Sequence, residues 1–339
     1  MQNRMRNSLS CALALLALTL LATAASAQTI APRRVAQNED RLSKASDQKP
    51  ASVLVYNFYT SDAADPARTD TRVTITNTHN QESATMHLFF VNGTEGAAGD
   101  AFVCLAPNQT ANFLASQIDP GVTGYVIAIA VDKATGCPIS FNRLVGSASV
   151  KMASGHAGTL NAIGFAALYQ GTLPGGCQAG DTFATLAFDG RIYDAVPRRL
   201  MLDKAPSVAD GYATRVVINS LNGNLATQLR PIGTYFGLYY DETNRPFSYA
   251  GNAPNQLNKV LSDEFPRSTP KFSEAIPAGQ TANLNFIVPR QGVGLTGAVF
   301  YHHPNGATQP GAFSGGAANL PSTETTNTTL VKPVFTPIC

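Results

Sequence analysis

Apolar and polar residues alternate with a period of two in several short blocks of the chain. In "TRVTITN", Val73 and Ile75 share one face of an extended strand while Thr74 and Thr76 share the other. Similar strand-like blocks are "SVLVYNFYT" from Ser52, "TMHLFFVNG" from Thr85, "AFVCLAP" from Ala101, "TANFLAS" from Thr110 and "GYVIAIAVD" from Gly124. Segments rich in Gly, Asn, Asp and Pro separate them, as turns require. Many short strands at short spacing predict a β-sandwich or barrel and disfavour a doubly wound sheet.

Helix candidates are few and short. The best are residues 160–170, "LNAIGFAALYQ", and residues 258–265, "NKVLSDEF". Neither is long enough to change the fold class, so we expect an all-β protein.

Three phrases of the first half of the chain return in the second half in the same order. They are TRVTI (from Thr71), QTAN (Gln109) and VTGYV (Val122), followed later by TRVVI (Thr214), QTAN (Gln280) and LTGAV (Leu295). Three echoes in order predict a duplicated unit. We therefore expect two tandem antiparallel β-sandwich domains, immunoglobulin-like or jelly-roll-like, at residues 51–175 and 176–339, the second with an insertion around residues 250–271. One larger sandwich that reuses a turn motif is the alternative.

The two QTAN copies have a structural explanation. In Pro277-Ala278-Gly279-Gln280 the proline presets φ and the glycine tolerates positive φ, so the chain turns tightly into a strand. Pro107-Asn108-Gln109 achieves the same turn with asparagine. The motif is therefore interpreted as scaffold.

The first 27 residues have the pattern of a signal peptide. Arg4 and Arg6 precede an apolar stretch that runs from Leu9 to about Ala22, and Ala25-Ser26-Ala27 is a small-x-small cleavage site. The apolar stretch is too short to span a bilayer easily, and no later segment is long enough, so we expect no transmembrane segment after cleavage. Residues 28–50 are polar, mixed in charge and almost free of aromatics, which predicts a flexible lead-in.

Cleavage leaves a mature chain without net charge. The full chain has 24 basic and 22 acidic residues, and the signal removes two arginines and no acid. Nucleic-acid-binding proteins usually carry a clustered basic excess, so we expect no nucleic-acid partner.

Four cysteines remain after cleavage, namely Cys104, Cys137, Cys177 and Cys339. An even number in an exported chain favours disulfides, and four cysteines permit three connectivities. We expect Cys104 to pair with Cys137 and Cys177 with Cys339, while an intermolecular bridge through Cys339 stays open. The sequence has no CxxC motif and no His at ligand spacing from a cysteine, so no metal or other cofactor is expected.

Five longer blocks are distributed along the mature chain: "FVCLAPNQTANFLASQIDPGVTGY", "SGHAGTLNA", "FDGRIYDAVPRRLMLD", "YFGLYYDETNRPFSY" and "HHPNGATQPGAFSGG". On these blocks the chain resembles an uncharacterised family of secreted bacterial proteins with immunoglobulin-like β-sandwich domains, and the similarity extends over most of the mature chain. The resemblance implies bacterial secretion, and it brings no activity or catalytic residues with it.

Histidines are the obvious candidates for general-base chemistry. His156 stands in "SGHAG", and His302 and His303 are adjacent, but no GxSxG or HExxH motif accompanies them. Structural histidines are therefore the preferred interpretation. A secreted hydrolase would need His156 or His302 to converge with carboxylates in a pocket.

Two groups of carboxylates are weaker candidates. Asp62, Asp65 and Asp70 lie in "SDAADPARTD" and could bind calcium, although their spacing matches no calcium loop. Asp189 and Asp194 in "FDGRIYD" could form a glycosidase pair. A turn aspartate beside Gly190 and a solvated Asp194 are the preferred interpretation.

One aromatic-rich stretch is the best candidate for a binding surface. Under strict alternation in "YFGLYYDETNRPFSY", Tyr235, Gly237 and Tyr239 face one side, while Phe236, Leu238 and Tyr240 face the other. The second set is more apolar and is assigned to the core, so Tyr235 and Tyr239 are the predicted exposed ligand contacts. The chain contains no tryptophan, which weakens a carbohydrate-binding interpretation.

The sequence thus predicts an exported, non-catalytic binding or structural protein outside the cytoplasm, in the periplasm, at the cell surface or in the medium. Its partner would be a protein or glycan at the cell surface. A secreted hydrolase with a loop-assembled site and a carbohydrate-binding module are the alternatives.

Overall fold

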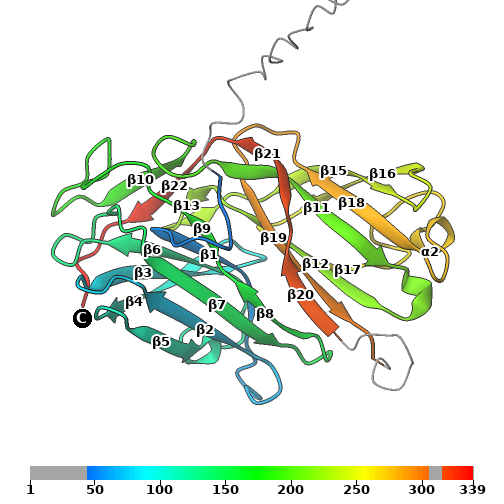
Figure 1. The fold of residues 1–339 in the computed structure, drawn as a ribbon, viewed down its shortest axis with the longest axis horizontal. Coiled ribbons are helices and arrows are strands. Elements are labelled where there is room, and N and C mark those ends of the chain that lie inside the picture. The colour runs from blue at the N-terminus through cyan, green and yellow to red at the C-terminus, as the bar shows by residue number, and fades with distance from the viewer. Residues whose placement is uncertain (1–43, 305–314, 339) are drawn as a thin grey trace, which may run out of the picture. The chain divides into compact units, whose positions relative to one another are not determined.

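The computed structural model describes residues 44–304 and 315–338. The predicted signal peptide, residues 28–43 of the lead-in and Cys339 lie outside the described residues. The described chain is all-β, as expected, and its strands form five small sheets (Figure 1).

The first set of strands forms two sheets. Sheet 1 has the order β4-β3-β6-β1-β9 and sheet 2 the order β5-β2-β7-β8. Their bounds are β1 Val53–Thr60, β2 Asp70–Asn77, β3 Ala84–Asn92, β4 Ala98–Leu105, β5 Thr110–Leu114, β6 Thr123–Val131, β7 Leu144–Lys151, β8 Ala157–Asn161 and β9 Ile163–Phe165, with a short 3-10 helix η1 at Ala115–Gln117.

The second set of strands forms sheets 3 and 4. Sheet 3 has the order β16-β15-β18-β11-β21 and sheet 4 the order β17-β12-β19-β20. Their bounds are β11 Val196–Pro206, β12 Ala213–Ser220, β15 Gly233–Tyr240, β16 Pro246–Ala253, β17 Gln256–Val260, β18 Thr281–Ile287, β19 Leu295–His302, β20 Gly315–Asn319 and β21 Ser322–Thr326, with η2 at Val208–Asp210 and the helix α2 at Phe272–Ala275.

Sheet 5 is built from strands that neither set uses. Its order is β10-β22-β13-β14, with β10 at Phe183–Phe188, β13 at Gly223–Asn224, β14 at Gln228–Leu229 and β22 at Thr328–Pro333. The late strand β22 lies inside this sheet, antiparallel to β10 and parallel to β13.

The prediction of two tandem β-sandwich domains of the immunoglobulin-like or jelly-roll-like kind is wrong. The strands form five small sheets, and sheet 5 covers a face of sheet 1 that a two-layered sandwich would leave to water. Val53 and Val55 of β1 share a core cluster with Leu186 and Leu330 of sheet 5, while Leu54 belongs to a different cluster against sheet 2. Strand β1 is therefore buried on both faces, which explains its continuous apolar run. The bounds 51–175 and 176–339 themselves stay a prediction.

The strand order of the first set is repeated in the second set. We leave out β13 and β14 and number the strands of each set in chain order. Sheet 3, β16-β15-β18-β11-β21, then has the same strand order as sheet 1, β4-β3-β6-β1-β9, and sheet 4, β17-β12-β19-β20, has the same order as sheet 2, β5-β2-β7-β8. An internal duplication therefore exists at the level of topology. The strands β13 and β14, which have no counterpart in the first set, fall between β12 and β15, outside the expected insertion around residues 250–271. The connection from β17 to β18, residues 261–280, overlaps the expected insertion and is longer than residues 115–122, which connect β5 to β6.

Only one of the three sequence echoes marks equivalent strands. TRVTI and TRVVI lie in β2 and β12, which hold the same position in sheets 2 and 4. The QTAN copies lead into β5, an edge strand, and β18, an interior strand, and the third echo falls in β6 and β19. The other two short sequences recur because a tight turn into a strand requires the same kinds of residue in both places, and not because their strands hold equivalent positions.

The local interpretation of both QTAN turns is confirmed. Asn108 has φ 57° and Gly279 has φ 80°, and the strands begin at Thr110 and Thr281. The carboxylate of Asp210 accepts a hydrogen bond from the Gly279 N–H, which holds the second turn in place.

Both helix candidates are wrong. Residues 160–170 contain the end of β8 and the strand β9, and residues 258–265 contain the end of β17. Residues 160–170 are extended because they pair with β7 and β1. These neighbouring strands supply the backbone hydrogen bonds that a helix would have formed within itself. The alternation in β2 is confirmed, since Val73 and Ile75 are buried and Thr74 and Thr76 are half-buried.

Cys137 and Cys177 form a disulfide, so both expected pairs are wrong. The bridge connects the turn after β6 to the loop before β10, and its Cα atoms lie 5.7 Å apart. Cys104 is also disulfide-bonded. A bridge through Cys339 lies outside the described residues.

A buried polar network joins the first and second sets of strands. The Asn57 amide of β1 donates to the Gly297 carbonyl and to Asn319 Oδ1, both at 2.8 Å. Asn219 donates to the Asn57 carbonyl, and Gln256 donates to Asn219 Oδ1, again at 2.8 Å. These groups are desolvated and paired, so the network fixes one relative position of the two sets.

The end of the predicted lead-in is bound to the sheets. Ser46 exchanges backbone hydrogen bonds with Gly164 of β9, and Asn319 donates to the Asp47 carboxylate. The Lys49 amine lies 2.6 Å from Asp194 Oδ2. Asp194 is fully buried, so the interpretation of this residue as solvated is wrong, and the lysine compensates its desolvated charge.

Candidate functional site

The predicted contacts Tyr235 and Tyr239 are buried. Their exposed fractions are 8% and 0%, and both belong to the core between sheets 3 and 4. The assignment of the two faces of β15 was therefore wrong. Tyr239 can be buried because its hydroxyl is hydrogen-bonded to Ser268 Oγ at 2.8 Å.

Glycines explain why the tyrosine face became the core face. A Cβ at Gly237 would overlap the Tyr249 ring, and a Cβ at Gly251 would overlap the Tyr235 ring. Each glycine therefore provides the space into which a neighbouring tyrosine packs. The Tyr249 hydroxyl then reaches the Asn285 carbonyl at 2.8 Å.

The opposite face of β15 carries an exposed ring beside an open groove. Phe236 is 41% exposed, and its neighbours across the sheet are Ala250 on β16 and Ile287 on β18. The groove has a volume of about 610 Å³. Phe236, residues 246–250 of β16 and residues 267–269 line it. We call it the Phe236 groove.

The polar side of the Phe236 groove is held in place. Ser268 Oγ accepts from the Tyr239 hydroxyl and donates to the Pro270 carbonyl at 2.9 Å. Ser248, Thr269 and Arg267 add hydroxyls and a guanidinium to the lining. The groove therefore combines one apolar ring face with several hydrogen-bonding groups, as small-molecule sites usually do.

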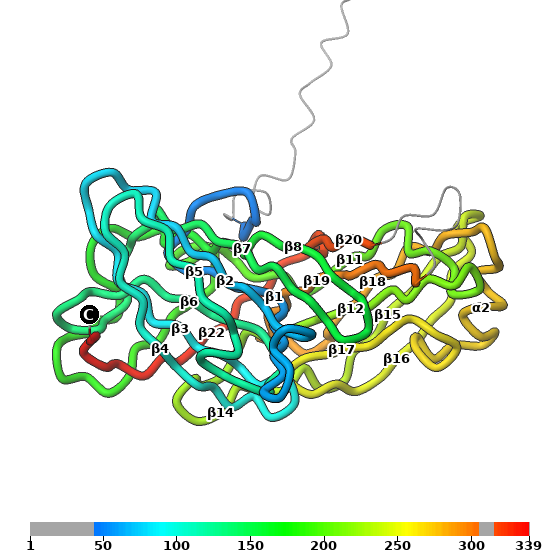
Figure 2. Tube along the Cα trace, turned by 90° about the horizontal axis from the view of Figure 1, so that it is seen from below, coloured from blue at the N-terminus to red at the C-terminus, as the bar shows by residue number. Residues whose placement is uncertain are grey.

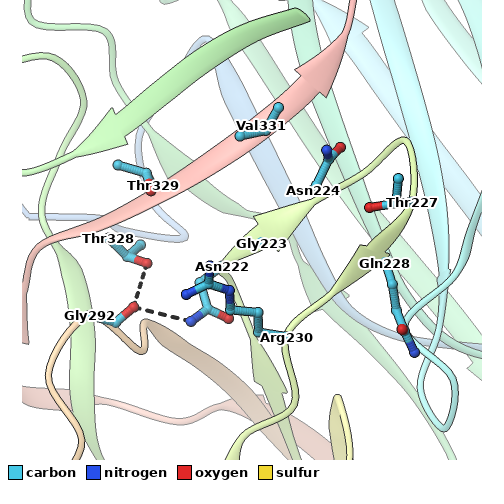
Figure 3. A pocket seen from close by; sticks show the side chains of 10 residues that line it. All are labelled: Asn222, Gly223, Asn224, Thr227, Gln228, Arg230, Gly292, Thr328, Thr329 and Val331. Atoms are coloured by element: carbon cyan, nitrogen blue, oxygen red, sulfur yellow. Dashed lines mark hydrogen bonds between the residues drawn. The ribbon is translucent and has the colours of Figure 1, made fainter.

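A second cleft lies between sheet 5 and the turn at Gly292 (Figure 3). Its volume is about 420 Å³. We call it the Arg230 cleft, and its lining comes from three separate segments: Asn222, Gly223, Asn224, Thr227, Gln228 and Arg230 around β13 and β14, Gly292, and Thr328, Thr329 and Val331 on β22. Sequence reasoning missed it because these segments are distant in the chain.

The predicted histidines meet each other and an arginine. The His156 and His302 rings have centroids 4.9 Å apart, and His156 is hydrogen-bonded to Ser154 Oγ and to the Ala213 carbonyl. Burial lowers the pKa of His156, and Arg215 adds to this lowering. His303 is bonded to the Asp210 carbonyl. His156 and His303 thus each contact a backbone carbonyl, and the interpretation of the three histidines as structural stays a prediction.

The predicted carboxylate candidates do not converge. Asp62 accepts from the Ala64 N–H and Asp65 from the Arg68 N–H, each within its own turn, while Asp70 is bonded to Ser116. Asp189 also caps a turn, through the Arg191 and Ile192 N–H groups. Within residues 44–304 and 315–338, no group of three or more His, Cys, Asp or Glu side chains is placed to hold a metal ion.

A buried titratable cluster was also missed by the sequence analysis. The fully buried His87 ring lies between Phe89 and Phe102, with centroids at 4.1 and 4.2 Å, and its Nε2 is 2.7 Å from Asp100 Oδ2. Burial lowers the pKa of His87 to about 4. Figure 2 shows the C-terminal segment passing β3 and β4, and there Phe335 also faces the imidazole.

Lys332 of β22 completes this cluster. Its amine is buried and donates to the Gly136 carbonyl at 3.0 Å and the Pro333 carbonyl at 2.8 Å. Burial lowers the pKa of Lys332 to about 8, although Asp100 opposes this effect. The rings of Phe89, Phe102 and Phe335 surround the His87 imidazole, and the cluster lies at the contact of sheets 1 and 5.

Comparisons with known proteins add little to this geometry. No protein-family model and no curated protein matches the chain. Among solved structures, the chain is similar to a mutant of the major pilin from Streptococcus pyogenes, with 11% identity over 77% of this chain and 98% of that one, at a TM-score of 0.20. A similarity at this identity and TM-score supports no statement about the fold or the function of this chain. In the described part of the chain, no helix has the length and apolar character needed to cross a membrane.

Proposed function

We propose that the protein is exported, is not an enzyme, and binds a glycan at the Phe236 groove. The observation that carries the proposal is the exposed Phe236 ring beside a hydroxyl-rich groove. A sugar ring has apolar C–H faces and a rim of hydroxyls, so one face can pack on Phe236 while the rim meets Ser248, Thr269 and Arg267.

The scaffold supports this proposal. Phe236 lies in the middle of β15, which pairs with β16 from Gly233 to Tyr240 and with β18 from Phe236 to Tyr240. The loop that carries Arg267 is tied to β15 through the Tyr239 and Ser268 hydroxyls. A site held by paired strands loses little conformational entropy when a ligand binds.

The signal-peptide pattern at residues 1–27 and the Cys137–Cys177 disulfide support export, because disulfides persist mainly outside the reducing cytoplasm. We place the protein in the periplasm, at the cell surface or in the medium.

The test is a glycan-array screen followed by calorimetric titration of the mature protein. We expect Phe236→Ala to weaken binding of the selected glycan at least tenfold, because the ring supplies the apolar contact. Phe183→Ala is the matched control, since Phe183 is 48% exposed on β10 of sheet 5, and it should bind as wild type. Equal binding by the Phe236→Ala variant, or no glycan bound by the wild type, contradicts the proposal.

A further inference from the structure

We propose that the Arg230 cleft is a second ligand site, and that it takes the carboxylate of a hydroxyl-rich small molecule such as an acidic sugar. The cleft belongs to sheet 5 and is separate from the Phe236 groove of sheet 3, with no lining residue in common. Its volume of about 420 Å³ is in the range of small-molecule sites.

The walls of the cleft are fixed before any ligand arrives. Asn222 Nδ2 and Thr328 Oγ1 both donate to the Gly292 carbonyl, at 3.1 and 2.8 Å, and these bonds are drawn in Figure 3. Asn222 Oδ1 in turn accepts from the Ser220 hydroxyl at 2.8 Å. These groups connect the hairpin β13–β14, the turn at Gly292 and strand β22, so the three walls hold one geometry.

The backbone of Arg230 is held by the same network. Its N–H donates to the Asn222 carbonyl at 3.0 Å, and its carbonyl lies 2.7 Å from Ser220 Oγ, whose single proton is shared between this carbonyl and Asn222 Oδ1. Its side chain is exposed and has no hydrogen bond or ion pair with the described residues. By contrast, Arg198, Arg199 and Arg245 each lie within 3.1 Å of a carboxylate. The guanidinium fork of Arg230 is thus available to a ligand.

Hydrogen-bond donors outnumber acceptors among the side chains that remain available in the cleft. Arg230 is the one charged residue of the lining, which includes no Asp or Glu. Asn224 Oδ1 already accepts from the Ala226 N–H, which leaves its Nδ2 as a donor, and Thr227 and Thr329 add hydroxyls. A cation surrounded by amide and hydroxyl donors matches a ligand rich in acceptors, and a carboxylate meets the planar fork of arginine in a bidentate way.

The test titrates the mature protein with glucuronate, glucose and inorganic phosphate by calorimetry. We expect glucuronate to bind at least tenfold more tightly than glucose, which lacks the charged pair with Arg230, and at least tenfold more tightly than phosphate, which lacks the hydroxyls that meet Asn224, Thr227 and Thr329. Glucuronate should bind more weakly as the salt concentration rises, because salt screens the charged pair. Arg230→Gln should lower the affinity for glucuronate at least tenfold. The affinity of Arg230→Lys should lie between those of wild type and Arg230→Gln, since lysine keeps the positive charge but lacks the planar guanidinium fork. The Arg230 side chain is exposed, so both variants should keep the wild-type melting temperature.

The groove variants serve as controls and separate this site from the proposed function. Arg267→Gln and Phe236→Ala should bind glucuronate as wild type, whereas Arg230→Gln should keep the glycan bound at the Phe236 groove. Equal affinity for glucose and glucuronate, equal affinity for phosphate, or full binding by Arg230→Gln each overturns the inference. Loss of glucuronate binding in Phe236→Ala would likewise overturn it, because the ligand would then occupy the other site.

Discussion

Replacement of His87 by phenylalanine should make the protein less sensitive to acid. The imidazole is fully buried among aromatic rings, and its Nδ1 has no hydrogen-bond partner among the described residues. A phenylalanine has a similar shape and removes a basic group that folding keeps neutral. Its partner Asp100 is 41% exposed, so the variant leaves that carboxylate hydrated rather than buried.

The magnitude follows from the two pKa values of His87. Burial lowers the pKa from 6.5 to about 4, so below pH 6.5 the unfolded chain binds a proton that the folded chain does not. The free energy of unfolding therefore falls as the pH decreases from 6.5 toward 4. Linkage gives a loss of about 3 kcal/mol between pH 7 and pH 4 from this residue.

Urea denaturation of the mature protein, followed by far-UV circular dichroism at pH 7 and pH 4, measures this effect. His87→Phe should lose about 3 kcal/mol less than wild type over the same interval. His79→Asn controls for an unspecific effect: His79 is half-buried, and an asparagine carbonyl can replace its Nδ1 as acceptor for the Gln81 and Glu82 N–H groups. If His87→Phe and wild type lose the same stability, the neutral buried state of His87 is refuted.

Three further predictions concern stability. The Cys137→Ser/Cys177→Ser double variant should lose about 4 kcal/mol in urea denaturation, because the bridge closes a loop with a sequence separation of 40; an unchanged midpoint would contradict the loop-closure argument. Lys49→Met should lose about 3 kcal/mol, since it leaves the Asp194 carboxylate buried without its cation; a loss below about 0.5 kcal/mol would mean that the pair is not formed in solution. Gly237→Ala should lose about 2 kcal/mol by thermal melting, because its Cβ would overlap the Tyr249 ring, whereas Gly99→Ala has open space and should be nearly neutral; equal effects of the two substitutions would argue against this packing.

The class of secondary structure was predictable from local pattern, but the faces and partners of strands were not. Alternation placed Val73 and Ile75 in the core correctly, because sheet 2 has one wet face. In β15, polarity predicted the wrong buried face. The tyrosine face can be buried because the Tyr239 hydroxyl has a hydrogen-bond partner and because Gly237 leaves space for an aromatic ring. Gly237 was the usable signal: a small residue alternating with tyrosines indicates a crowded face rather than an exposed one.

The number of sheets and the candidate sites depend on contacts between distant segments. Nothing local in "TTLVKP" shows that β22 lies between β10 and β13, or that Lys332 comes near His87. The disulfide was mispredicted for the same reason, because chain order does not give the distance between Cys137 and Cys177. The Phe236 groove adjoins the stretch that the sequence singled out, whereas the Arg230 cleft required the assembled sheet 5.

The position of β22 sets the order in which the chain can complete its structure. Val53 and Val55 of β1 are made early, but one of the apolar layers that buries them contains Leu330 of β22. A ribosome releases residues 328–333 only after all the preceding strands have been synthesised. Until β22 has been synthesised, the core between sheets 1 and 5 lacks Leu330, so this core is among the last parts of the described fold that the chain can complete.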